Sequence, residues 1–301
     1  VTEVFKSSSD ASFLKHAGVT GFDDPNYERY STRLARLRDI KNYSYRMDVL
    51  ERTKTYEEVT EIFVRVNSLG AKLRSSDLAL AQVTAKWRGS LAIFQQFEKD
   101  CINNRFDLEI GVHLKNLVAF ATQQSKFLSV GRIPLDTLKT SWDSAQDGMN
   151  FAINFARHNC GITSAALLTS PFLMIVLAIY GHHRGYSLGL DDAADLRQWA
   201  LLANAKGRFG RGSTETFLDQ DLQVILKEHG TPRDLIDRLR LQVGKLDFTP
   251  EDLQGRNQRS AVFKTMFIAF RAAGAKDWKS QLAISEDLAG SSSKLQFHHI
   301  F

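Results

Sequence analysis

The sequence predicts a mainly α protein, a multi-helix domain with a small α/β remnant at the N-terminus and a single strand at the C-terminus. Three observations indicate this class. From Tyr56 onward, apolar residues recur at the three- and four-residue spacing of amphipathic helices. Only five prolines interrupt the 301 residues. Alternation of the kind that strands show is confined to two short stretches, 43–49 and 294–297.

Residues 1–55 predict the C-terminal remnant of an α/β domain. Pro25 is suited to the start of a helix, and the residues after it place Tyr27, Tyr30, Leu34 and Leu37 on one face. The segment 43–49 then alternates as a strand would.

Residues 56–287 predict a helical domain. A helix over 56–67 is expected to end at Gly70, and Ser75 or Ser76 should cap the next one, with Asp77 in its first turn. The other helices are expected at 106–127, 134–158, 163–182, 191–205, 213–229, 233–243 and 258–274. Residues 288–301 then predict a short linker and the start of another domain.

Composition limits the class of protein without identifying it. Hydrophobic residues make up 43% and charged residues 24% of the chain, as in ordinary globular proteins. A formal charge of +5 permits binding to phosphate polymers but does not require it. Cys101 and Cys160 lie far apart and outside any CxxC, which favours reduced thiols and a cytoplasmic protein. The longest apolar run, 165–181, is too short and interrupted for a membrane span, so it predicts a buried helix and no membrane partner.

Two His-His pairs have different settings. His182-His183 ends an apolar helix, where cationic residues complement the helix dipole, and this favours a structural role. His298-His299 ends the predicted strand 294–297 and precedes Ile-Phe. Neighbouring side chains of a strand point to opposite faces, so both rings can serve one site only if the backbone turns there.

Two further stretches could hold an anion. Arg65 and Asn67 stand at a helix end beside Gly70, where they fit either turn chemistry or contact with a phosphate. The stretch 206–221 places three cations and three glycines before a helix N-terminus, which suits phosphate binding by side chains such as Arg208 and Arg211. Its carboxylates, Glu215, Asp219 and Asp221, are expected to be dipole and ion-pair partners, not metal ligands.

Taken together, these stretches resemble the GmrSD family of modification-dependent (type IV) restriction endonucleases. The matching segments are Ile-Phe-x-Arg-x-Asn-x-x-Gly-x-x-Leu with a following Asp-Leu (62–78), the Gly-rich turn leading to Glu-Thr-x-Leu-Asp-x-Asp (208–221), Gly-Ala-x-Asp-Trp (274–278), and the terminal His-His-Ile-Phe (298–301). Their order and spacing fit the family from about residue 20 to the end.

The resemblance implies a larger enzyme with a ParB-like domain, a helical region and an HNH (ββα-metal) nuclease domain. It implies that His299 is the general base and that His298 occupies the metal-binding position. Arg65, Asn67, Arg208 and Arg211 are the candidates for phosphate or nucleotide contact that their residue types and positions suggest. The family's Asp-Gly-Gln-Gln-Arg motif is missing and the HNH motif stops at its first element. This chain is therefore expected to be an inactive fragment of a DNA-cutting parent.

For the complete protein, the resemblance implies Mg²⁺ or Mn²⁺, a nucleoside triphosphate and modified DNA as ligands; none is firmly expected for the fragment. Homo-oligomerisation stays open. The alternative is a non-catalytic helical module that binds DNA or a protein partner. A second strand and an Asn-bearing helix after Phe301 in the parent reading frame would favour the nuclease over this adaptor.

Overall fold

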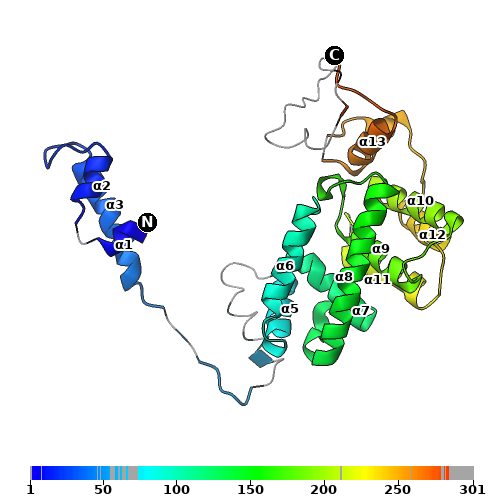
Figure 1. Cartoon of the computed structure of the whole chain (residues 1–301), viewed down its shortest axis with the longest axis horizontal. Helices are drawn as coiled ribbons and strands as arrows, with labels where there is room; N and C mark the ends of the chain where they lie inside the picture. Colours follow the sequence, from blue (N-terminus) through cyan, green and yellow to red (C-terminus); the bar gives the residue numbers. More distant parts are fainter. Residues whose placement is uncertain are drawn as a thin grey trace. The chain divides into compact units, whose positions relative to one another are not determined.

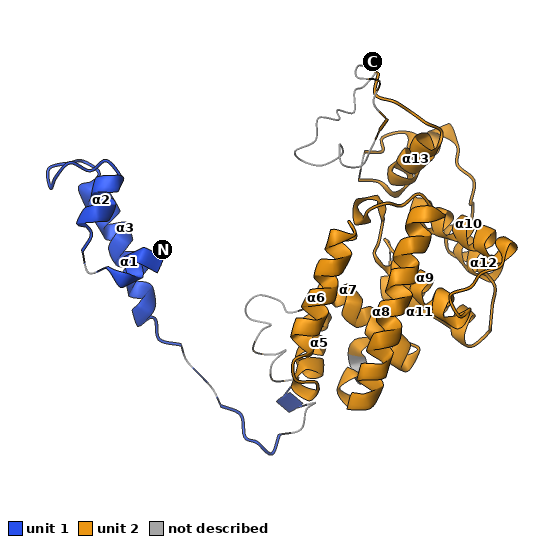
Figure 2. Cartoon of the chain, in the orientation of Figure 1, with its two compact units in different colours: residues 1–59 blue, residues 60–301 orange. Residues whose placement is uncertain are grey.

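The computed structural model describes residues 2–7, 9–45, 47, 49–54, 58–59, 62, 66, 74–210, 212–257, 259–278, 281 and 283–284. The chain forms two compact units, Val1–Val59 and Thr60–Phe301 (Figure 2).

The first unit is helical in its described part. It consists of α1 (Thr2–Lys6), α2 (Ala11–His16), α3 (Tyr27–Asp39) and the 3-10 turn η1 (Ile40–Asn42). Its small core contains Val4, Leu14 and Val19. Arg38 of α3 forms an ion pair with Asp10 before α2 at 2.5 Å, which ties the two helices together. The helix predicted after Pro25 is confirmed as α3.

In the described residues of 1–55 the regular secondary structure is helical, and the strand of the expected α/β remnant is not seen among them. The strand predicted at 43–49 is absent from the described residues of that segment, which are 43–45, 47 and 49. Tyr43 and Tyr45 are exposed and pack edge-to-face on each other, with ring centroids 5.0 Å apart. The prediction was wrong because alternation alone does not provide a neighbouring strand to accept the backbone hydrogen bonds.

The second unit confirms the mainly α prediction. Its described helices are α5 (Ser75–Lys86), α6 (Ser90–Asn103), α7 (Ile110–Thr122), α8 (Leu135–His158), α9 (Phe172–His183), α10 (Leu190–Lys206), α11 (Thr214–Leu226), α12 (Pro232–Val243) and α13 (Ala261–Ala272). Short 3-10 turns are η2 (Phe127–Arg132), η3 (Ala165–Leu167) and η4 (Pro250–Leu253). Among the residues the structure describes, β pairing is limited to an isolated bridge between Lys276 and Ala283.

Helix α9 forms the centre of this unit (Figure 1). It contacts α7, α8, α10 and α11, and its residues 173–181 are all buried. The prediction of a buried core helix in the apolar run 165–181 is therefore confirmed from Phe172 onward, while residues 165–167 form the 3-10 turn η3 and residues 168–171 are not helical. Gly181 faces Phe151 of α8 so closely that a Cβ on the glycine would lie 2.2 Å from the ring. A glycine is required where these two helices meet.

Two predicted helices are shorter than expected, since α7 spans Ile110–Thr122 and not 106–127, and α9 begins at Phe172 and not at 163. One predicted helix cap was also wrong, and one helix was not predicted. The cap of α5 is Arg74, whose backbone N–H donates to the Asp77 carboxylate at 3.0 Å, and not Ser75 or Ser76. Helix α6 was not predicted, although its buried residues Phe94, Phe97 and Cys101 recur at helical spacing. In the described part of the chain, no helix is both long enough and apolar enough to cross a membrane.

Candidate anion-binding pocket

The glycine-rich stretch of the sequence forms the turn between α10 and α11. Gly207 adopts φ +66°, a left-handed conformation that favours glycine, and it ends α10. The Arg208 backbone N–H donates to the Ala203 carbonyl at 2.9 Å, and the Gly210 N–H donates to the Gly207 carbonyl at 2.9 Å. The turn is therefore compact and hydrogen-bonded to itself.

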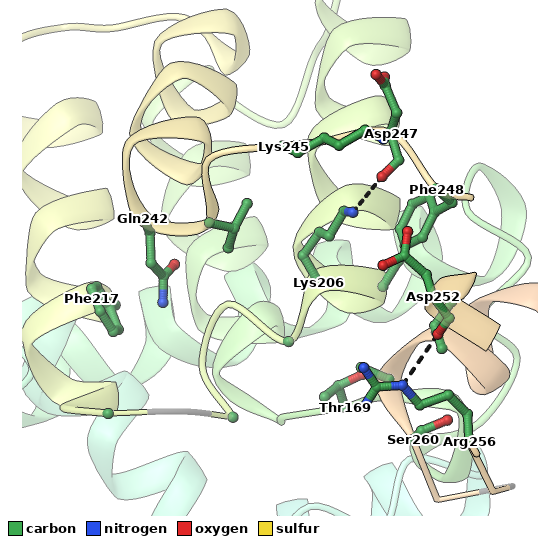
Figure 3. Close-up of a pocket in the computed structure, with 17 residues that line it drawn as sticks. Thr169, Lys206, Phe217, Gln242, Lys245, Asp247, Phe248, Asp252, Arg256 and Ser260 are labelled. Carbon is green, nitrogen blue, oxygen red and sulfur yellow. Dashed lines mark hydrogen bonds between the residues drawn. The ribbon is translucent and has the colours of Figure 1, made fainter. Parts of the chain in front are cut away.

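This turn borders a pocket of about 750 Å³ (Figure 3). The C-terminal end of α12, the segment 245–248, η4 and the start of α13 supply the other walls. The residues that line it are Thr169, Ala205, Lys206, Gly207, Gly210, Gly212, Phe217, Gln242, Val243, Lys245, Asp247, Phe248, Asp252, Arg256, Ser260, Ala261 and Val262. A cavity of this size is large enough for a nucleotide-sized ligand.

Three cations and two carboxylates contribute to the lining. The Lys206 ammonium donates to the Asp247 backbone carbonyl at 2.6 Å and lies 3.8 Å from the centroid of the Phe248 ring. Lys206 thus fixes the segment 245–248 against α10. The Lys245 side chain is exposed, and its ammonium forms no hydrogen bond or ion pair with a described residue.

The other two charged residues of interest lie around η4. The Arg256 guanidinium donates to the Asp252 backbone carbonyl at 3.2 Å. The Asp252 carboxylate accepts the Thr249 N–H at 2.9 Å, and this hydrogen bond lowers the pKa of Asp252. Because Asp252 is held as a helix cap, Lys245 and Arg256 are the cations best placed to meet an incoming anion.

Arg208 lies behind the pocket wall and not in the pocket. Its side chain is fully buried, and its two nitrogens Nε and Nη2 donate to the Asp221 carboxylate at 2.9 and 2.6 Å. Its remaining nitrogen, Nη1, donates to Gln242 Oε1 at 2.7 Å. Burial raises the pKa of Asp221 to about 6 against the lowering effect of Arg208. The structure therefore places Arg208 in a buried ion pair that joins the turn to α11 and α12.

The carboxylates of the following motif are likewise engaged in structural contacts. Glu215 accepts from the buried Lys115 ammonium of α7 at 2.6 Å, and Asp219 accepts from the Ser125 backbone N–H at 2.6 Å. The ion pair expected for Asp221 with Arg208 is confirmed. The partners of Glu215 and Asp219 are on and just after α7, however, and were not foreseen because nothing in the local sequence specifies them.

The remaining predicted site residues lie outside the described residues. They are His298, His299, Arg65, Asn67 and Arg211, together with the predicted strand 294–297 and the linker 288–293. Of the predicted helix 56–67, the described residues are 58–59, 62 and 66, and these are helical. The divalent metal that the resemblance implies would bind at His298, so the described residues give no test of its fit. Within those residues, no cluster of three or more His, Cys, Asp or Glu side chains could hold a metal ion.

The residues of the pocket wall after α12 were not predicted from the sequence. Lys245, Phe248 and Arg256 follow α12 in a stretch without helical periodicity. The only local signal is Thr249-Pro250 with Asp252, which form a helix-capping arrangement that fixes η4. That signal predicts a turn, but it does not predict which wall the turn faces.

Comparison with known proteins gives no assignment. No family model matches the chain, and no curated protein matches it.

Proposed function

We propose that the chain is the central helical part of a GmrSD-like, nucleotide-regulated restriction endonuclease. The parent enzyme would hydrolyse phosphodiester bonds of modified foreign DNA at a metal-dependent HNH site. The proposal is supported by the order of the four matching segments in the sequence. The observation that carries it is that the glycine-rich segment, in which anion binding was expected, borders a pocket with three cations.

The pocket is assigned to the phosphates of a nucleoside triphosphate. Lys245 and Arg256 would bind the phosphate oxygens, since both are exposed and line the pocket. Backbone N–H groups of a glycine-rich turn can approach an anion closely because no Cβ intervenes. Lys206 would keep the 245–248 segment in place.

Cleavage is assigned to the terminal histidines, as the resemblance implies. His299 would accept the proton of the attacking water, and His298 would bind the divalent ion. That ion would supply positive charge to the phosphate and the leaving oxygen.

The nuclease assignment is tested with the parent protein. Plasmid DNA carrying modified bases is incubated with Mg²⁺ or Mn²⁺ and either the wild type or His299→Ala, with folding of both checked by circular dichroism. Removal of a general base should reduce cleavage by about 100-fold or more. Equal cutting by the two proteins would remove His299 from its role and favour the alternative of a non-catalytic binding module.

The pocket assignment is tested by calorimetric titration of the 301-residue chain with ATP and with GTP. Lys245→Ala/Arg256→Ala should weaken binding by at least about tenfold, because two charge-assisted contacts are lost. Lys139→Ala/Lys227→Ala, which removes two exposed lysines that do not line the pocket, should bind like the wild type. If the wild type binds neither nucleotide, the pocket is not the regulatory site.

A further inference from the structure

Helix α3 of the first unit has three arginines on one face. Arg29, Arg33 and Arg36 stand four and three residues apart, so they form a line along the helix, which we call the arginine stripe. All three are exposed. They line a shallow groove of about 380 Å³, whose other residues are Pro25, Glu28 and Thr32.

The stripe lies on the side of α3 that does not face the unit's core. Tyr30, Leu34 and Leu37 are half-buried and each follows a stripe arginine by one residue, which is about 100° around the helix. Through that neighbouring face α3 packs against α1 and α2. The arginines are therefore accessible without any rearrangement of the unit.

The guanidinium groups of the stripe make no hydrogen bond or ion pair with a described residue, unlike other cations of the same unit. Arg38 pairs with Asp10 at 2.5 Å, and Lys41 donates to the Phe5 backbone carbonyl. Residues 1–59 contain as many Asp and Glu residues as Lys and Arg residues. The stripe is thus a local segregation of positive charge and not the result of an overall basic unit.

Such an arrangement is unfavourable for the unit alone, because like charges three and four residues apart on a helix repel each other. A ligand with several negative charges in a row would remove that repulsion. The helix rise places the outer two arginines about 10 Å apart along the axis. In duplex DNA, phosphates of one strand recur about every 3.4 Å along the axis, so each guanidinium can reach a phosphate of its own.

We propose that the arginine stripe binds the phosphodiester backbone of duplex DNA without reading its sequence. The residues of the groove are polar or charged apart from Pro25, so the groove offers no apolar side chain of the kind that inserts into a lipid surface. The choice of DNA among phosphate polymers rests on the proposed function. The stripe itself is independent of the nucleotide pocket and of His299.

The test is the salt dependence of DNA binding by the 301-residue chain, measured by fluorescence anisotropy with a labelled 30-base-pair duplex. The triple variant Arg29→Ala/Arg33→Ala/Arg36→Ala should lower the slope of log affinity against log salt by about 3, since each lost phosphate contact contributes about 0.9. Between 50 and 200 mM salt, the wild type should accordingly lose about 40-fold more affinity than the variant. Alanine favours helix, so α3 should persist, which circular dichroism checks.

Two matched variants make the outcome specific. Arg29→Lys/Arg33→Lys/Arg36→Lys keeps the charges and should retain the slope. Arg88→Ala/Lys99→Ala/Lys139→Ala removes the same charge at exposed positions of the second unit and should bind like the wild type. An equal loss in the alanine variants of both units, or no DNA binding by the wild type, would overturn the proposal.

Two further arms separate the possible sources of failure. Binding to phosphatidylserine vesicles but not to the duplex would overturn the assignment to DNA. The chain with His299→Ala should bind the duplex unchanged, because binding and cutting use different residues. If the parent enzyme cuts normally without His299 while the stripe still binds DNA, the proposed function fails and the stripe assignment stands.

Discussion

The buried ion pair of Arg208 and Asp221 gives the sharpest prediction for the stability of the second unit. Both side chains are fully buried, and two hydrogen bonds of 2.9 and 2.6 Å join them. Asp221→Asn keeps the volume of the side chain but removes its charge, so Arg208 becomes an uncompensated buried cation. Breaking one side of such a pair costs about 3–5 kcal/mol. We therefore expect the free energy of unfolding to fall by about 3 kcal/mol or more.

The assay is urea unfolding followed by tryptophan fluorescence at pH 8, above the pKa of about 6 that burial gives Asp221. All four tryptophans lie in residues 60–301, so the signal reports on the second unit alone. Asp237→Asn is the matched control: it breaks an exposed pair with Arg240, whose contribution should be at most about 0.5 kcal/mol.

A double variant distinguishes the charge effect from a simple loss of packing. Arg208→Met/Asp221→Leu replaces the pair by apolar side chains of similar size, which is often neutral for buried pairs. It should be less destabilised than Asp221→Asn alone. A loss below about 1 kcal/mol for Asp221→Asn, or a double variant as unstable as the sum of its single changes, would refute this account of the pair.

Three more predictions concern buried groups. Burial lowers the pKa of His113 to about 4, so the unfolded chain takes up a proton near pH 6.5 and the folded chain does not. The free energy of unfolding should therefore be unaffected by His113 above pH 6.5 and should fall by about 3 kcal/mol as the pH decreases to 4. His113→Gln should lack this loss in urea titrations. Burial raises the pKa of both Cys101 and Cys160 to about 12, so a disulfide reagent at pH 8 should react with these thiols only as fast as the unit unfolds. Gly181→Ala should destabilise the unit by about 1–3 kcal/mol in thermal unfolding, because the new Cβ meets Phe151.

Each of these has a control or a contradicting result. An unchanged pH dependence in His113→Gln would assign the acid loss to other groups. Rapid modification of both thiols in the native protein would show that they are not buried. Gly189→Ala, which adds a Cβ in open space before α10, should leave stability nearly unchanged.

The helical core could be predicted from the sequence because its signals are local. Helices such as α8 and α10 combine a long apolar stripe with defined ends, and their observed bounds lie within one residue of those predicted. The prediction of a strand at 43–49 was wrong because its signal is not local. The alternating pattern is adequate, but a strand needs a partner strand that the sequence does not specify. Helix α6 was missed although its buried positions follow the same rule as those of α8.

The candidate site could be predicted only in part. The glycine-rich stretch was singled out because glycines and cations before a helix suit an anion, and that stretch does border a pocket. Which cations face the pocket could not be foreseen, since Arg208 turns inward to Asp221 while Lys245 and Arg256 come from segments more than thirty residues away in the sequence. Burial and long-range pairing decide this, and neither is a local property.

If the proposed function is right, the contacts of the motif 208–221 allow a loss of stability to be told apart from a loss of DNA cleavage. Arg208, Glu215, Asp219 and Asp221 are held by partners on α7, α12 and the loop after α7, so they join distant parts of the helical body. Changing one of them should lower stability first, and cleavage only as far as the body loosens. Changing His299, the proposed general base, should lower cleavage at constant stability, because a general base acts on the reaction and not on the fold. A cleavage defect in Asp219→Asn at unaltered stability would therefore mean that the motif does more than hold the helical body together.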